Sequence, residues 1–177
     1  MDGLKLKEPR RQEELFMDMK WKNVGVAALQ ETMWSQDATV HNSEGAIIID
    51  FKTTDAGYRG LGFYLSPQWA KRLVSTKVIN DRVVVARLKA FNADKTDLAI
   101  VNAYAPTIMR AKENPEITEA FYHQLRQVYN QERRGMTSTF VLGDFNAKIG
   151  KPHADDNIFM GRYGKGDRDE NEEEDDN

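Results

Sequence analysis

The stretch from Ser138 to Gly150 constrains the fold of this chain most, because a short apolar run in it ends abruptly at a glycine. Four strand-favouring residues, 139–142, precede Gly143, a pattern typical of a buried strand that ends at the rim of a sheet. Asp144 and Asn146 follow at alternate positions, which places them on the same side of the chain. A carboxylate beside a carboxamide suits the orientation of a water against a phosphate. A plain turn is the alternative, since Gly, Asp and Asn are common turn residues.

The composition indicates a soluble globular protein with one domain. The chain has 177 residues, of which 40% are hydrophobic and 30% are charged, and this length allows a sizeable core. No apolar run approaches the ~20 residues of a membrane-spanning helix, and the first residues lack the apolar segment of a secretion signal. The absence of cysteine excludes disulfides and thiolate metal sites. We therefore expect a cytoplasmic or nuclear protein that is not secreted.

The charge of the chain is divided unevenly. Residues Asp167 to Asn177 carry eight acidic side chains and one basic side chain, a local net charge of −7. Because the whole chain has a net charge of −3, the remainder carries +4. A mildly basic body is compatible with nucleic acid as a partner, although it is weaker than the basic surface of most nucleic-acid-binding domains.

Hydrophobic periodicity predicts an α/β protein in which a run of antiparallel strands precedes the last long helix. Helices are expected at Pro9–Trp21 and Pro115–Gln131, with one or two helical turns within Pro67–Leu73. The apolar face of the second long helix is expected to comprise Ile117, Ala120, Phe121, Leu125 and Val128. Strands are expected at Val24–Leu29, Ala46–Phe51, Gly60–Ser66, Val83–Leu88, Asp97–Ala103 and Thr139–Leu142. Turns are expected near residues 55–57 and 92–95.

Polar residues stand at the ends of three of these strands. Glu31 follows the strand that starts at Val24, Tyr104 ends the strand before Pro106, and Asp144 follows the last strand. The ends of strands in one layer converge in space, and such edges are where α/β proteins place ligand-binding groups. For any one of them an ordinary alternative remains: a solvated glutamate, a tyrosine at the edge of the core, or a turn aspartate.

Three short motifs carry a resemblance to a known family. They are Leu29-Gln30-Glu31-Thr32, Asn102-Ala103-Tyr104-Ala105-Pro106 and Gly143-Asp144-Phe145-Asn146. Their order and rough spacing resemble the endonuclease/exonuclease/phosphatase superfamily, and within it the endonuclease domain of LINE-type retrotransposons and the craniofacial-development-protein-2-like sequences. Segments 60–63, 80–82 and 145–150 fit that branch as well. The resemblance covers roughly residues 12 to 171.

The resemblance implies a four-layer α/β sandwich and metal-dependent hydrolysis of a phosphodiester, usually in DNA. By position, Glu31 resembles the ligand of Mg²⁺ (or Mn²⁺), and Asp144 resembles the base that orients and activates water. Asn146 would then hold the scissile phosphate, and Tyr104 would support it from the side. A hard cation of this kind prefers oxygen ligands and neutralises developing charge on a phosphate.

The chain also departs from the family at both ends. The family begins with a strand that carries a metal-binding Asn, whereas this chain starts near the first helix, and Asn23 lies too close to Glu31 to correspond to that Asn. We therefore expect residues 1–154 to form a partial domain that lacks the first and the C-terminal strands. Residues 155–177 are expected to form a glycine-containing loop and a disordered acidic tail.

The family ends with an Asp-His pair, and no such pair matches here. His41, His123 and His153 all lie in other contexts. With Glu31 as the single metal ligand, Mg²⁺ binding is expected to be weak, and the activity is expected to be impaired. Two alternatives stay open: a non-catalytic remnant or binding protein, and a phosphatase or exonuclease of the same superfamily that acts on a phosphoinositide, a sphingolipid or an RNA end.

Overall fold

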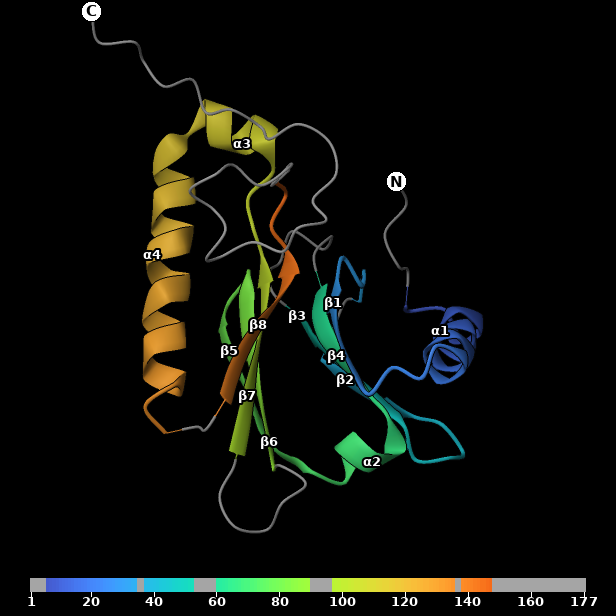
Figure 1. Cartoon of the computed structure of the whole chain (residues 1–177). Helices are drawn as coiled ribbons and strands as arrows, with labels where there is room; N and C mark the ends of the chain where they lie inside the picture. The colour runs from blue at the N-terminus through green and yellow to red at the C-terminus, as the bar shows by residue number, and fades with distance from the viewer. Residues whose placement is uncertain (1–5, 35–36, 53–59, 90–96, 136–137, 148–177) are drawn as a thin grey trace, which may run out of the picture.

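Two four-stranded sheets face each other in the computed structural model, which describes residues 6–34, 37–52, 60–89, 97–135 and 138–147 (Figure 1). The helices are α1 (Pro9–Trp21), α2 (Pro67–Ala70), α3 (Ile108–Glu113) and α4 (Pro115–Glu132). The strands are β1 (Val26–Gln30), β2 (Ala38–His41), β3 (Ile47–Lys52), β4 (Gly60–Leu65), β5 (Leu73–Asn80), β6 (Val83–Lys89), β7 (Asp97–Tyr104) and β8 (Ser138–Asp144). The first sheet has the order β1-β4-β3-β2 and is antiparallel throughout. The second has the order β5-β6-β7-β8 and is mixed, because β8 runs parallel to β7.

The elements stack in four layers, with α1 outside the first sheet and α4 outside the second (Figure 1). Phe16 of α1 packs with Leu29, Ile48 and Tyr64 on the outer face of the first sheet. Apolar side chains of β3 and β4 meet those of β6 and β7 between the two sheets. Phe121, Leu125 and Val128 of α4 pack on the outer face of the second sheet. The chain is therefore a mixed α/β protein with three apolar interfaces between four layers.

A partly buried ion pair attaches the C-terminal end of α4 to the second sheet. Arg87 of β6 donates two hydrogen bonds to the carboxylate of Glu132, at 2.8 and 2.9 Å. Glu132 is only 3% exposed, so its carboxylate depends on the guanidinium for compensation of its charge. The pair joins the last residue of α4 to β6, and the chain then returns to form β8.

The parallel pairing of β7 and β8 requires a long connection, and α3 and α4 supply it. At the end of this pairing, Gly143 lies opposite Ala103 with a φ of +155°. A Cβ atom on residue 143 would lie 1.8 Å from the carbonyl oxygen of Ala103, so only glycine allows the two strands to approach this closely. The glycine that interrupts the apolar run therefore serves the contact that sets the end of β8.

Most expected elements are present. The helix expected at Pro9–Trp21 is confirmed with the same bounds, and the second long helix extends one residue beyond its expected end. The strands expected in the middle of the chain match β3, β4, β6 and β7 to within one residue at each end. The expected antiparallel run is confirmed by the pairing of β3 with β4 and of β6 with β7. The turns expected near residues 55–57 and 92–95, and the loop and tail at 155–177, lie outside the described residues.

Two strands and one helix were not expected. β2 has four residues and lies at the edge of its sheet, and β5 carries Ser75, Thr76 and Lys77 at the edge of the other sheet. Polar residues at a sheet edge break the apolar pattern by which strands are recognised. α3 has only six residues, and the helix expected within Pro67–Leu73 is limited to α2 because β5 begins at Leu73.

The expectation that Thr139–Leu142 is a buried strand is wrong. Phe140 is 51% exposed and Leu142 is 37% exposed. Both belong to β8, the last strand of its sheet, and within the described ranges no further strand pairs with its outer edge. An apolar sequence favours a strand, but the position at the edge decides whether its side chains are covered.

The apolar face expected for the second long helix is correct only in its C-terminal part. Phe121, Leu125 and Val128 are buried, whereas Ile117 is 38% exposed and Ala120 is exposed. Glu132 is buried in line with the three buried apolar residues. The first turn of α4 therefore extends past the sheet that the rest of the helix covers. Within the described residues, no helix is both long enough and apolar enough to cross a membrane.

Candidate active site

A hydrogen bond between the two sheets joins two of the residues expected at the site. Tyr104 is the last residue of β7 and is 5% exposed, and Glu31 follows the last residue of β1. The hydroxyl of Tyr104 donates to Oε1 of the half-buried Glu31 carboxylate. The two residues are 73 positions apart in the sequence, so the fold brings them together. The tyrosine hydroxyl is thus engaged by a carboxylate at the end of the neighbouring sheet.

Asp144 and Asn146 lie at the same end of the second sheet. Asp144 is opposite Tyr104 in the parallel register of β7 and β8, and its carbonyl oxygen accepts a hydrogen bond from the N–H of Ala105 at 2.9 Å. Nδ2 of Asn146 donates to the carbonyl oxygen of Ala105 at 2.8 Å. The backbone N–H of Asn146 donates to Oδ1 of Asp144 at 2.8 Å. The backbone of Asp144 and the side chain of Asn146 are therefore both attached to Ala105, the residue that follows Tyr104.

The segments that carry the site residues have unusual backbone conformations. Glu31 has a φ of +53°, Met33 a φ of +59° and Asn146 a φ of +49°. Asparagine tolerates the left-handed region, but glutamate and methionine rarely adopt it. Such residues cost about 1–3 kcal/mol each and persist where the surrounding structure holds them, often at functional sites. The segment after β1 is therefore held in place by contacts that offset this strain.

A buried amide network fixes the strand ends behind the site, and the sequence reading assigned it no role. Nδ2 of Asn102 donates to the carbonyl oxygens of Leu29 and Gly62, at 2.9 and 2.8 Å. Oδ1 of Asn102 accepts a hydrogen bond of 2.6 Å from Nε2 of Gln30. Asn102 is 0% exposed, so these bonds satisfy both of its polar atoms and tie β7 to the first sheet. Both residues stand inside the motifs that carry the family resemblance, which was the available signal.

Arg82 contacts both the backbone and the ring of Tyr104. Its Nη1 donates to the carbonyl oxygen of Tyr104 at 3.1 Å, and its own carbonyl oxygen accepts the N–H of Tyr104 at 2.9 Å. The guanidinium carbon lies 5.8 Å from the centre of the Tyr104 ring, within cation–π range. Arg82 is 8% exposed. The tyrosine is therefore held through its backbone and its ring, in addition to its hydroxyl.

The donor atoms of the site suit a hard divalent cation of modest affinity. Glu31 and Asp144 offer carboxylate oxygens, and Asp144 is exposed to solvent. In the described part of the chain, no group of three or more His, Cys, Asp and Glu side chains is arranged to hold a metal ion. Mg²⁺ commonly binds through one or two carboxylates and completes its shell with water and substrate phosphate. The residues present fit a Mg²⁺ site of this open kind.

Asn23 lies away from this site, as do the described histidines. It occupies the turn between α1 and β1, whereas Glu31 follows the other end of β1. His41 ends β2 and His123 is exposed on α4. His153 lies outside the described residues. Within the described residues, no histidine therefore accompanies Glu31 and Asp144.

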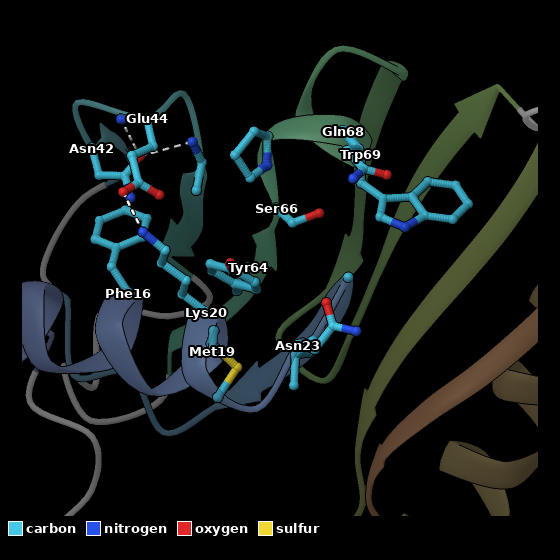
Figure 2. A pocket seen from close by; sticks show the side chains of 14 residues that line it. Phe16, Met19, Lys20, Asn23, Asn42, Glu44, Tyr64, Ser66, Gln68 and Trp69 are labelled. Carbon is cyan, nitrogen blue, oxygen red and sulfur yellow. Dashed lines mark hydrogen bonds and ion pairs between the residues drawn. The ribbon is translucent and has the colours of Figure 1, made fainter.

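A pocket beside α1 is also separate from the site. It has a volume of about 520 Å³ and lies between α1 and the ends of β3 and β4, next to Gly25 and Ser66 (Figure 2). Phe16 and Tyr64 line it, and an ion pair of 2.5 Å between Lys20 and Glu44 crosses its rim. Gly25 and Ser66 flank the ends of β1 and β4 opposite to Glu31, so the pocket and the candidate site occupy opposite ends of the first sheet.

Comparisons with known proteins add no family to these observations. No protein-family model matches the sequence, and no curated protein matches it. The functional interpretation therefore depends on the residues of the site, their contacts and the fold that positions them.

Proposed function

We propose that this chain is a metal-dependent phosphodiester hydrolase that resembles the endonucleases of the endonuclease/exonuclease/phosphatase superfamily, with DNA as its substrate. The observation that carries the proposal is the hydrogen bond from Tyr104 to Glu31, which joins two of the three motifs across the two sheets. Asp144 and Asn146, from the third motif, lie beside Tyr104 at the end of β8. A likeness in four scattered residues is more informative when the fold gathers them at one end of the sheets.

The layered arrangement supports the same assignment. The superfamily has two packed sheets flanked by helices, and here α1 and α4 flank two facing sheets (Figure 1). The proposal includes the retrotransposon-derived branch of the superfamily. The three sequence motifs that resemble this branch lie at the ends of β1, β7 and β8. Fold alone does not determine function, so the assignment rests mainly on the site.

The roles of the residues follow from their contacts. Glu31 would hold Mg²⁺ or Mn²⁺, which supplies positive charge against the phosphate oxygens when bound. Tyr104 orients the Glu31 carboxylate, because its hydroxyl is already donated to that carboxylate. Asp144 accepts the proton of the attacking water and holds the water in line. Asn146 uses one amide hydrogen on Ala105, and its second hydrogen is the donor proposed to bind the phosphate.

A binding protein without catalysis is the second candidate. It is favoured by the absence of a histidine beside Glu31 and Asp144 among the described residues. A positioned general acid or base contributes about 10²- to 10⁴-fold to a rate. If no imidazole takes part, cleavage would be slower by about this factor, and slow cleavage is harder to distinguish from DNA binding alone.

Nicking of supercoiled plasmid by the purified chain tests the proposal. Wild-type protein is expected to nick with Mg²⁺ and not with EDTA, and Glu31→Gln is expected to lose at least about 100-fold in rate, because a bound cation is worth several kcal/mol to a phosphoryl transition state. The matched control is Glu113→Gln, which changes an exposed glutamate on α3. Equal nicking by wild type and Glu31→Gln would overturn the assignment of Glu31.

A panel of substrates separates the remaining possibilities. The same protein is incubated with duplex DNA, single-stranded RNA and an inositol phosphate, with release of product and retention on a filter measured in parallel. The proposal predicts cleavage of DNA above the other substrates. Retention of DNA without cleavage, unaffected by Mg²⁺, would indicate the binding protein. Cleavage confined to RNA or inositol phosphate would show that DNA is not the substrate and would favour another activity of the superfamily.

A further inference from the structure

A buried aspartate lies near the site, on the face of the first sheet that α1 covers. Asp50 belongs to β3 and is 0% exposed. The hydroxyl of Thr32, which is also 0% exposed, lies 2.7 and 2.8 Å from the two carboxyl oxygens of Asp50. Thr32 directly follows Glu31, so this contact acts on the segment that carries the proposed metal ligand.

The contact reaches across a whole strand, and two glycines make room for it. β4 lies between β3 and β1, with Gly62 opposite Asp50. A Cβ atom on Gly62 would lie 2.8 Å from Oδ1 of Asp50, and a Cβ atom on Gly60 would lie 1.7 Å from Oγ1 of Thr32. Any larger residue at position 60 would displace the threonine hydroxyl. The two glycines of the Gly-Leu-Gly sequence in β4 therefore leave the space in which the Asp50 carboxyl group and the Thr32 hydroxyl form their contact.

The segment held by this contact has a strained backbone. Glu31 and Met33 both have positive φ angles, and Thr32 lies between them. Three hydrogen bonds fix Thr32: its hydroxyl with Asp50, its carbonyl oxygen with the N–H of Leu6 at 2.9 Å, and its N–H with the carbonyl oxygen of Gly60 at 3.4 Å. Thr32 is thus the point at which the strained segment is attached to the core.

Glu31 is consequently held from two sides. Tyr104 holds the Glu31 carboxylate from the second sheet. Thr32, bonded to Asp50, holds the backbone next to Glu31 on the α1 side of the first sheet. Asp50 and Tyr64 lie on that side because they alternate along their strands with residues that face the second sheet. We propose that Asp50 and Thr32 are positioning residues that set the place of Glu31 in the candidate metal site. The part of this inference that concerns the metal rests on the proposed function. The part that concerns the anchoring of residues 31–33 rests on the contacts alone.

The test compares Thr32→Val with Thr32→Ser in the full chain. Valine keeps the shape of threonine and removes the hydroxyl, and serine keeps the hydroxyl. For Thr32→Val we expect the Mg²⁺ concentration at half-maximal nicking to rise about 10- to 100-fold, the range found when groups behind a metal ligand are removed. Thr32→Ser is expected to restore the wild-type value. A hydroxyl that only stabilised the fold would change the unfolding temperature without changing the dependence on Mg²⁺.

Amide hydrogen exchange at residues 31–33 gives a readout that does not depend on activity. Thr32→Val is expected to speed exchange there by about 10-fold or more, because the segment loses the buried hydrogen bond that attaches it to Asp50. The control is Thr118→Val on α4, which removes a buried hydroxyl that has no hydrogen-bond partner among the described residues. Unchanged exchange at 31–33 in folded Thr32→Val would overturn the anchor.

The outcomes separate this inference from the function on which it rests. If wild type shows no response to Mg²⁺, the proposed function and the positioning of a metal ligand both fail, and faster exchange at 31–33 in Thr32→Val still establishes the anchor. If wild type responds to Mg²⁺ and Thr32→Val responds equally, the function stands and the positioning role is wrong.

Discussion

The free energy of unfolding of Asp50→Asn, minus that of wild type, is expected to rise by about 4 kcal/mol between about pH 4 and pH 8. Burial raises the pKa of Asp50 from 3.8 to about 7, with a small contribution from nearby Asp37, and the hydrogen bonds from Thr32 and from the N–H of Phe51 oppose the rise. Each pKa unit corresponds to about 1.4 kcal/mol between the two protonation states.

The sign follows from the protons bound in each state. Below the unfolded pKa of 3.8, Asp50 is protonated in both the folded and the unfolded protein and causes no loss of stability. Between that value and about 7 the folded protein keeps the proton that the unfolded chain has released, so wild type loses stability as the pH rises. Asparagine does not titrate, and its amide oxygen can still accept the Thr32 hydroxyl.

Chemical denaturation of both proteins at a series of pH values measures this difference in the free energy of unfolding. The contributions of the other titrating groups cancel, because both proteins contain them. Asp37→Asn is a suitable control, because Asp37 is exposed and makes only the smallest contribution to the raised pKa of Asp50. It is expected to reproduce only a small part of the effect. A difference between Asp50→Asn and wild type that does not change with pH would show that Asp50 ionises in the folded protein as it does in the unfolded chain.

Asp144→Asn is expected to lower the rate of Mg²⁺-dependent nicking by about 10²- to 10⁴-fold, the usual contribution of a positioned base. The substitution removes the proton acceptor proposed for the attacking water. It keeps an oxygen that can accept the N–H of Asn146, which now bonds Oδ1 at 2.8 Å, so the turn after β8 should persist. The effect should appear in the single-turnover rate at saturating Mg²⁺, with DNA binding unchanged.

Asp97→Asn provides the matched comparison for this prediction. Asp97 is the first residue of β7, and Tyr104, which pairs with Asp144, is the last, so the same chemical change is made at the far end of the same sheet. Asp97→Asn is expected to nick at the wild-type rate. A rate for Asp144→Asn within twofold of wild type would remove Asp144 from the mechanism, and an equal loss in both variants would indicate a general effect of charge.

The parts of the fold that the sequence predicts are those in which burial and periodicity agree. β3 and β4 are covered on both faces, by α1 and by the second sheet, so their sequences are largely apolar, with Asp50 as the buried exception in β3. α1 begins at a proline, which is favoured in a first helical turn. β2 and β5 have no such signal, because edge strands tolerate polar residues on their open side.

The same reasoning explains which parts of the site were foreseen. Glu31, Tyr104, Asp144 and Asn146 stand out because each is polar and lies at the end of an apolar run, and their catalytic roles stay predictions. Asn102 and Asp50 lie inside such runs, where a single polar residue gives no indication of its partner. Their partners, Gln30 and Thr32, are 72 and 18 residues away, and only the pairing of the strands brings them into contact.

Paramagnetic broadening by Mn²⁺ in the NMR spectrum of the full chain locates the metal without relying on turnover. Mn²⁺ substitutes for Mg²⁺ at oxygen sites. We predict that substoichiometric Mn²⁺ broadens the amide signals of Glu31, Tyr104 and Asp144 before those of other described residues, and that Glu31→Gln removes this selectivity. Broadening confined to other residues, with the signals of Glu31 and Tyr104 unchanged, would contradict the assignment of a metal-dependent phosphodiesterase site to this end of the sheets.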